Sequence, residues 1–402
     1  MSNLFTGLKV LDFGSNAAAP SATAMLADFG ANVFKIERPG LGDDNRSYGP
    51  FIEGHSLLAM WFNRSKKSLA MDMKHPKAKE LVMQLAKEAD VVVESFRPGV
   101  IAKMGFSYDD IVKINPNVIM CSVSAFGQYG PYAQKAGYDL MAQAMSGIMS
   151  LSGPVEGPPC RVGTAIGDFC GGFHAFAAIS AALYHRERTG EGQYIDISLL
   201  DGLMVANEYC DMAFNGFEVK RTGNHHTTIA PFGLFEGNDG SLMIGTVGEP
   251  LWRKLCALMG TEHLLEDPGF ANSGLRSERT DILTPIVEKW LKSFPTIEEA
   301  RKVLDDNGIP CGKVNSLLDL MDDPQIRARE MIVDLQVPYI SQKTVKARGN
   351  YLKFSKTKPE MRPVPNLGEH TEEVLRSELG LSKEAIEQLA AEGVFGEPKG
   401  GK

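Results

Sequence analysis

The sequence predicts an α/β fold with a mostly parallel sheet in the first half of the chain and a smaller α+β unit after it. Three observations predict this arrangement. Short apolar runs alternate with helical spacing up to residue 200, a polar and irregular segment follows at residues 221–228, and a hairpin signal lies beyond it. Strands that alternate with helices form right-handed βαβ units and parallel sheets. A chain of 402 residues is long enough for two or three domains.

The expected strands of the first half are short and apolar, at residues 8–13, 31–37, 90–93, 118–123 and 194–199. Helical patterns lie between or after them, at residues 20–29, after Pro76, in a small-residue stretch at 170–188, and at 201–214. Proline suits the first turn of a helix because its missing N–H would have no partner there.

The second half has a different pattern. Residues 234–236 and 242–244 flank Gly237-Asn238-Asp239-Gly240, which predicts a β-hairpin. Helical patterns follow at residues 250–259 and 281–293. Residues 343–368 are rich in Pro and Lys and are expected to be extended, and Ser382 begins a last helix.

The composition argues against several classes of protein. The net charge is −8, from 42 basic and 50 acidic residues, which does not suit a protein that coats nucleic acid. Six scattered cysteines without a Cys-x-x-Cys pair indicate reduced thiols rather than a zinc ribbon or a disulfide framework. The best apolar run, residues 175–184, is shorter than the ~20 residues that a membrane span needs. We expect a cytoplasmic protein with no nucleic-acid or membrane partner.

Common catalytic motifs are missing from the sequence. The turn after the first strand, residues 14–19, lacks the three-glycine dinucleotide fingerprint, and there is no P-loop, His-Glu-x-x-His or Gly-x-Ser-x-Gly. His225 and His226 are adjacent and have no matching acids nearby, so we expect no metal site.

Basic residues gather where strands are expected to end. Arg38 follows the second strand, Arg97 and Lys103 follow the strand at 90–93, and residues 63–67 add a local basic cluster. Ligands of doubly wound sheets bind outside the carboxyl ends of the strands, and phosphate groups favour Arg and Lys. These residues are therefore candidates for phosphate binding, the alternative being solvated surface charges.

Asp168 lies among glycines just before the small-residue helix. One interpretation is a helix N-cap, for which Asp is a preferred residue. The other is a nucleophilic carboxylate beside backbone N–H groups that stabilise an oxyanion. The pattern alone leaves both open.

Several stretches together resemble the class III CoA-transferases, the CaiB/BaiF family, over essentially the whole chain. The matching stretches are residues 7–13, 27–40, 115–116, 124–131, 137–139, 143–147 and 190–193. The resemblance implies that Asp168 is the nucleophile and forms an aspartyl anhydride and then an aspartyl-CoA thioester. It also implies that CoA enters as a thioester substrate, with no permanently bound cofactor. An aspartate with a reference pKa of about 3.9 would be ionised at neutral pH and would need no general base.

The resemblance also implies the binding residues. By position, the CoA pocket would contain Arg38, Met71, Ser95, Arg97 and Lys103. The acyl end near Asp168 would be lined by Asn16, Ala17, Tyr138 and Asp139.

The sequence departs from the formyl-CoA transferases of this family. Those enzymes carry Gln at the position of Ala17, Lys at Ala136, and a glycine-rich lid at residues 229–233. A bulkier or more apolar acid is therefore expected. Two alternatives stay open. One is an α-methylacyl-CoA racemase, in which a histidine stands at Tyr138, and the other is a partner subunit of a heteromeric transferase.

The family's architecture implies a Rossmann-like large domain at residues 1–200 plus 385–402 and a small α+β domain at 223–318. Residues 201–222 and 319–384 would be linkers, the second one extended. Each subunit would then be a ring, and two rings would interlock as a homodimer, with a heteromer as the alternative. Active sites would lie at domain or subunit interfaces.

Overall fold

The computed structural model describes residues 3–396, so the two ends of the chain, including the last residues of the expected large domain, lie outside it. The chain forms two compact units. The first contains residues 1–146, 163–207 and 325–402, and the second contains residues 147–162 and 208–324.

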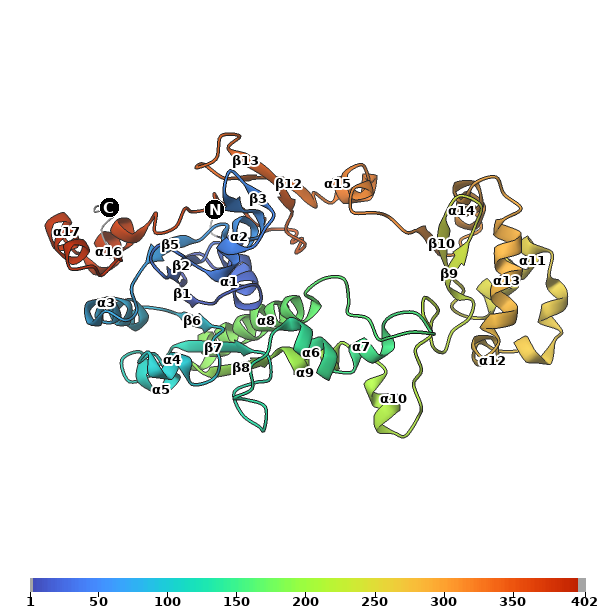
Figure 1. Cartoon of the computed structure of the whole chain (residues 1–402), viewed down its shortest axis with the longest axis horizontal. Helices are drawn as coiled ribbons and strands as arrows, with labels where there is room; N and C mark the ends of the chain where they lie inside the picture. Colours follow the sequence, from blue (N-terminus) through green and yellow to red (C-terminus); the bar gives the residue numbers. More distant parts are fainter. Residues whose placement is uncertain (1–2, 397–402) are drawn as a thin grey trace. The chain divides into compact units, whose positions relative to one another are not determined.

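The first unit is built on a six-stranded parallel sheet with the strand order β5-β2-β1-β6-β7-β8 (Figure 1). The predicted α/β fold with a parallel sheet is therefore confirmed. The strands are β1 (Lys9–Phe13), β2 (Asn32–Glu37), β5 (Lys67–Ala70), β6 (Val91–Glu94), β7 (Ile119–Ser124) and β8 (Tyr194–Ser198). Two short strands outside this sheet, β3 (Phe51–Ile52) and β4 (His55–Ser56), form a hairpin.

Strand β5 was missed because it begins with polar residues inside the supposed basic cluster. Its polar side chains have partners within the fold. Ser68 donates a hydrogen bond to Glu37 (2.5 Å), and Lys67 pairs with Glu373 (2.7 Å). Because its polar side chains have hydrogen-bond and ion-pair partners, this edge strand does not need an apolar sequence pattern.

Helices cover both faces of the sheet (Figure 1). One side carries α3 (Pro76–Lys87), α4 (Val100–Lys103) and α5 (Tyr108–Ile111), and the other carries α1 (Ala18–Asp28) and α8 (Ile166–Thr189). Helices α1 and α8 pack closely because α8 has glycine at the contact. A Cβ on Gly172 would clash with Ser21 and come within 2.8 Å of the Ala18 carbonyl oxygen.

Two expected helices differ from the structure. Helix α8 starts at Ile166 rather than at residue 170. The helix expected at 201–214 is instead two short helices, α9 (Leu199–Val205) and α10 (Cys210–Phe214), and the chain passes from one unit to the other between them. The first unit also contains α2 (Leu57–Asn63) and α6 (Asp139–Met145).

The supposed linker at residues 319–384 contains regular structure. It holds α15 (Pro324–Ala328), the antiparallel strands β12 (Ile332–Gln336) and β13 (Thr344–Arg348), and α16 (Thr371–Leu379). The expectation of an extended linker is wrong for these stretches, because Leu335 and Val345 bury their side chains in a small core with Met60. Helix α17 (Lys383–Ala391) follows Ser382, which caps it as expected.

The second unit combines helices with an antiparallel sheet. The predicted hairpin is present as β9 (Phe232–Glu236) and β10 (Ser241–Gly245), and β11 (Cys311–Lys313) extends it. The helices are α7 (Ile148–Leu151), α10, α11 (Glu249–Met259), α12 (Ser273–Ser277), α13 (Thr280–Leu291) and α14 (Ile297–Asp306). Helices α11, α13 and α14 pack around buried Trp252, Leu255 and Val287.

Among the described residues one helix, α8, is long and apolar enough to cross a membrane by length and composition. This is weak evidence, because core helices of soluble proteins pass the same test. The sequence pattern understated the length of this helix.

Candidate active site

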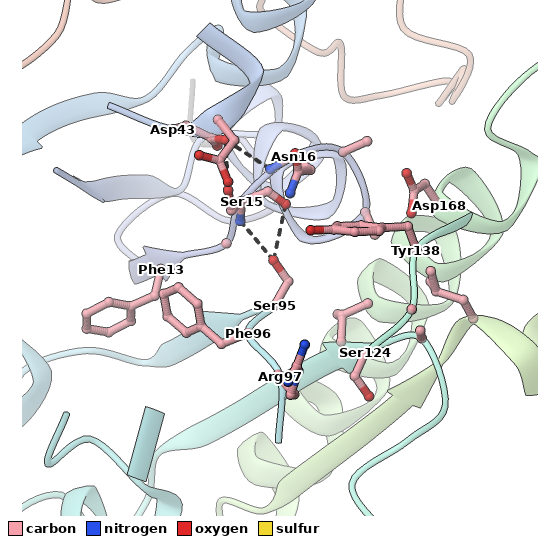
Figure 2. A pocket seen from close by; sticks show the side chains of 18 of the residues that line it. Phe13, Ser15, Asn16, Asp43, Ser95, Phe96, Arg97, Ser124, Tyr138 and Asp168 are labelled. Carbon is pink, nitrogen blue, oxygen red and sulfur yellow. Dashed lines mark hydrogen bonds between the residues drawn. The ribbon is translucent and has the colours of Figure 1, made fainter. Parts of the chain in front are cut away.

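A pocket of about 440 Å³ lies at the carboxyl ends of β1, β6 and β7 (Figure 2). The chain passes from β1 to β2 and β5 on one side and from β6 to β7 and β8 on the other, so the strand order reverses between β1 and β6. Open parallel sheets bind their ligands at such a point. The expectation of a ligand site at the strand ends agrees with this placement.

The loop after β1 forms one wall of the pocket and is held by buried charges. The carboxylate of Asp43 accepts hydrogen bonds from the Ser15 hydroxyl (3.1 Å) and the Asn16 backbone N–H (2.9 Å). Its other oxygen lies 3.0 Å from the ammonium group of Lys35, which also donates to the Gly14 carbonyl oxygen. This support matters because Asn16 has a φ of 66°, a left-handed conformation that residues other than glycine rarely adopt.

Three basic side chains line the pocket: Arg38, Arg97 and Lys135. Arg38 pairs with Asp44 and is more than half exposed. Within the described part of the chain, the side chain of Arg97 has neither an ion pair nor a hydrogen bond. Ser95, next to it, accepts a hydrogen bond from the Ser15 N–H (2.8 Å). Arg97 is therefore available to an anion, as is Lys135, whose ammonium group lies over the Tyr132 ring and has no carboxylate partner among the described residues.

The basic cluster at residues 63–67 does not face the pocket. Arg64 is buried and pairs with Asp28 (2.7 Å), and Lys66 is buried and pairs with Asp12 (2.9 Å). Burial lowers the pKa of Lys66 to about 8. The prediction of a phosphate-binding role for this cluster is wrong, because Arg64 and Lys66 neutralise buried carboxylates and Lys67 pairs with Glu373.

Two other expected CoA-pocket residues lie outside the pocket lining. Met71 is fully buried in the core beside α3, and Lys103 is an exposed residue at the end of α4. The pocket does bring together Arg38, Ser95 and Arg97 with Asn16, Ala17, Tyr138 and Asp168.

Asp168 lies in the first turn of α8, inside the helix. The N-cap interpretation is therefore wrong, since the N-cap position is Ala165, which has no side-chain cap. Figure 2 shows the ring of Tyr138 reaching into the pocket beside Asp168. Burial and the neighbouring Asp139 raise the pKa of Asp168 to about 7. Full ionisation at neutral pH, expected from the reference value, therefore does not hold for this carboxyl group.

Asp139 was expected to line the acyl end, but it is buried and is not part of the pocket lining. Its Oδ1 accepts hydrogen bonds from the backbone N–H groups of Gly167 (2.7 Å) and Asp168 (3.4 Å). The carboxylate therefore occupies amide groups of the helix start that were expected to stabilise an oxyanion.

Sequence reasoning missed Asp43 and Lys135 as pocket residues. Lys135 lies next to Ala136, where the family resemblance implies a lysine in formyl-CoA transferases, so the neighbouring residue was the available signal. Asp43 gave no signal, because its role depends on ion pairing with Lys35 and on the folded loop after β1.

Among residues 3–396 there is no group of three or more His, Cys, Asp or Glu side chains placed to hold a metal ion. His226 stacks on Phe232 and contacts the hydroxyl of Tyr209 at 3.5 Å.

The chain is similar in sequence and in structure to known proteins. The chain is 36% identical to the succinyl-CoA:glutarate CoA-transferase of Mus musculus, over 97% of this chain and 89% of that protein. It is 39% identical to the acetyl-CoA:oxalate CoA-transferase of Acetobacter aceti, over 82% of this chain and 85% of that protein. A CaiB/BaiF family protein from Brucella suis has a similar crystal structure, with a TM-score of 0.81 and 34% identity over 94% of this chain and 100% of that chain.

The model of CoA-transferase family III matches residues 5–371, nearly the whole chain. The mouse and Acetobacter relatives of this chain are CoA-transferases that act on acyl-CoA esters and carboxylic acids. The chain therefore belongs to CoA-transferase family III and is an enzyme of that class.

Proposed function

We propose that this enzyme transfers CoA from an acyl-CoA donor to a carboxylic acid through two covalent intermediates on Asp168. The observation that carries the proposal is the placement of this one carboxylate, at the start of α8, in the same pocket as the unpaired Arg97. A CoA thioester requires both groups, because the nucleophile attacks its thioester carbonyl and the anion-binding group contacts its phosphates.

The atoms balance without another reactant. A carboxylate oxygen of Asp168 attacks the thioester carbonyl, a C–O bond forms, the C–S bond breaks, and CoA leaves as a thiolate. The thiolate attacks the aspartyl carbonyl of the anhydride, which releases the donor acid and leaves an aspartyl-CoA thioester. The acceptor carboxylate then repeats the two steps in reverse order and leaves as its CoA ester. Because one thioester replaces another, no ATP is consumed.

The raised pKa of Asp168 is compatible with this chemistry. A pKa of about 7 leaves a large share of the carboxylate ionised at neutral pH, and a nucleophile that is poorly stabilised attacks more readily. Holding the thiolate beside the anhydride supplies the proximity advantage of an intramolecular reaction.

We propose a short dicarboxylic acid of four or five carbons as acceptor, with succinyl-CoA as donor. The mouse relative is named for succinyl-CoA and glutarate, and the small side chain of Ala17 leaves space in the wall beside Asn16. The Acetobacter relative is named for oxalate, so the acceptors glutarate, oxalate and formate should be compared with succinyl-CoA as the donor. A preference for oxalate would contradict this choice of acid.

The chemistry is tested on Asp168 itself. The D168A variant should lose transfer, and hydroxylamine added with succinyl-CoA should convert Asp168 of the native enzyme to a hydroxamate that mass spectrometry locates. D168A with near-native rates would exclude the mechanism. The racemase alternative is tested in the same assay by hydrogen exchange at the α-carbon of a 2-methylacyl-CoA, which Tyr138 is not expected to support.

We further propose that two subunits interlock as rings in a homodimer. The first unit exposes large apolar side chains on three helices, which a lone subunit would leave in water: Leu140, Met141 and Met145 on α6, Phe173 and Tyr184 on α8, and Met204 and Val205 on α9. Chromatography with light scattering on the chain expressed alone tests this, and a folded, active monomer would contradict it. The same assay separates the heteromeric alternative, in which the chain alone would be inactive. A cytoplasmic location stays a prediction.

A further inference from the structure

Asp139 and Asp168 are joined through the backbone of the helix that carries the nucleophile. Asp139 is the first residue of α6 and is buried. Its Oδ1 accepts hydrogen bonds from the backbone N–H groups of Gly167 (2.7 Å) and Asp168 (3.4 Å) at the start of α8. A helix start has unpaired N–H groups, and a residue at the N-cap usually satisfies one of them. Here a carboxylate from another helix does so.

Gln143, one turn further along α6, holds this carboxylate in place. Its fully buried side-chain amide donates to Asp139 Oδ2 (2.7 Å) and to the Thr164 carbonyl oxygen (3.2 Å). The same side chain therefore braces both Asp139 and the segment that leads into α8. The spacing between Asp139 and Gln143 is i,i+4, which places the two side chains on one face of α6.

The carboxyl group of Asp168 is left without such support. Within the described residues it accepts no hydrogen bond, and the two causes that raise its pKa are burial and the charge of Asp139. Other ionisable groups lie on the elements packed against α8 and are not among those causes: Asp28 on α1, Cys121 on β7, Tyr194 and Asp196 on β8, and Asp201 on α9.

We propose that Asp139 is a positioning residue for the nucleophile: it fixes the start of α8, occupies the amide groups there, and so keeps the Asp168 carboxylate poorly stabilised until it is acylated. Two like charges repel in the free enzyme. In the anhydride and in the aspartyl-CoA thioester, Asp168 is neutral and the repulsion is gone. Asp139 thereby favours the covalent intermediates over the free carboxylate. This inference rests on the proposed role of Asp168 and gives Asp139 no contact with substrate.

Asp139→Asn is the informative variant, because an asparagine keeps an oxygen for the two N–H groups and removes the charge. The apparent kcat should fall about tenfold, and the KM for the CoA ester should stay within about twofold, since the interaction acts after binding. The acid limb of the pH–rate profile should move about one pH unit lower, because the loss of a like charge lowers the pKa of Asp168. Asp139→Ala, which removes the cap as well, should reduce kcat further.

Gln143→Met is the second variant, since it removes both amide donations without changing any charge. It should lower kcat with an unchanged KM and should keep the test available if Asp139 variants do not fold. Unchanged kcat and pH profile in Asp139→Asn, or in Gln143→Met where it replaces that variant, would overturn the inference. A rise in the KM for the acid with an unchanged kcat would also overturn it, because it would make Asp139 a substrate contact. D168A separates the two failures: an active D168A refutes the proposed function, whereas an inactive D168A with a native-like Asp139→Asn refutes only this inference.

Discussion

Lys35 on β2 and Asp43 in the loop after it form a fully buried ion pair, with 3.0 Å between the ammonium nitrogen and the carboxylate oxygen. Both residues anchor the loop after β1. Lys35 donates a hydrogen bond to the Gly14 carbonyl oxygen, and Asp43 accepts hydrogen bonds from the Ser15 hydroxyl and the Asn16 N–H. This buried ion pair therefore fixes the loop that forms one wall of the pocket.

Lys35→Met should destabilise the protein by about 3–5 kcal/mol, because it leaves the buried carboxylates of Asp12 and Asp43 without one of their cations. Lys67→Met is the matched control. It removes an ion pair with Glu373 that is largely open to solvent, and it should cost about 1 kcal/mol or less. Thermal unfolding of both variants measures the difference. Equal losses would show that the Lys35 pair contributes no more than a surface pair.

Arg97→Met should raise the KM for the CoA ester about tenfold or more, because a charge-assisted hydrogen bond to an anion is lost. Lys103→Met is the control, since Lys103 carries a similar charge outside the pocket lining. Its KM should stay within about twofold of the native value. A rise of similar size in both variants would favour the pocket composition implied by the family resemblance.

Asp168→Asn should stabilise the protein at pH 8 and not at pH 4. The pKa of Asp168 is raised from 3.8 to about 7 in the folded state, so the native state binds a proton more tightly than the unfolded state does. Stability from this group is present below pH 3.8 and is lost as the pH rises through about 7. Removing the charge should therefore raise the melting temperature by about 3 °C or more at pH 8. An equal change at both pH values would contradict the shifted pKa.

Gly172→Ala should cost about 1–3 kcal/mol, because its Cβ would meet Ser21 and the Ala18 carbonyl oxygen where α1 and α8 touch. Gly163→Ala is the matched control and should not destabilise the protein, because a Cβ there would meet nothing within 4 Å. Melting temperatures of the two variants test the contact. A neutral Gly172→Ala would mean that α1 can shift without loss.

Local signals predicted much of the fold. The strands β1, β2, β6 and β7 were recognisable because buried parallel strands read as short apolar runs, and β8 was recognisable from its alternation of apolar and polar residues. The hairpin of β9 and β10 was recognisable from its glycine-rich turn. Strand β5 and the hairpin of β12 and β13 were missed, since polar and basic residues interrupt them.

The candidate site was predicted in part. Asp168, Arg97, Ser95 and Asn16 came from strand ends, a helix start and the family resemblance, and they do share one pocket. The basic residues 63–67 were misassigned because a sequence shows that a residue is charged and not whether an opposite charge lies beside it.

The sequence by itself determined the strand–helix alternation, the family, and the identity of the aspartate at the start of α8, because neighbouring residues carry periodicity, turn signals and motifs. Only the tertiary structure decided which charges are available to a ligand and how the nucleophile is held. Lys35 forms an ion pair with Asp43, and Asp139 accepts a hydrogen bond from the N–H of Asp168. Both contacts exist only when the chain is folded. Burial and a like charge at that contact move the pKa of Asp168 from 3.8 to about 7, and both depend on distances that a sequence does not contain.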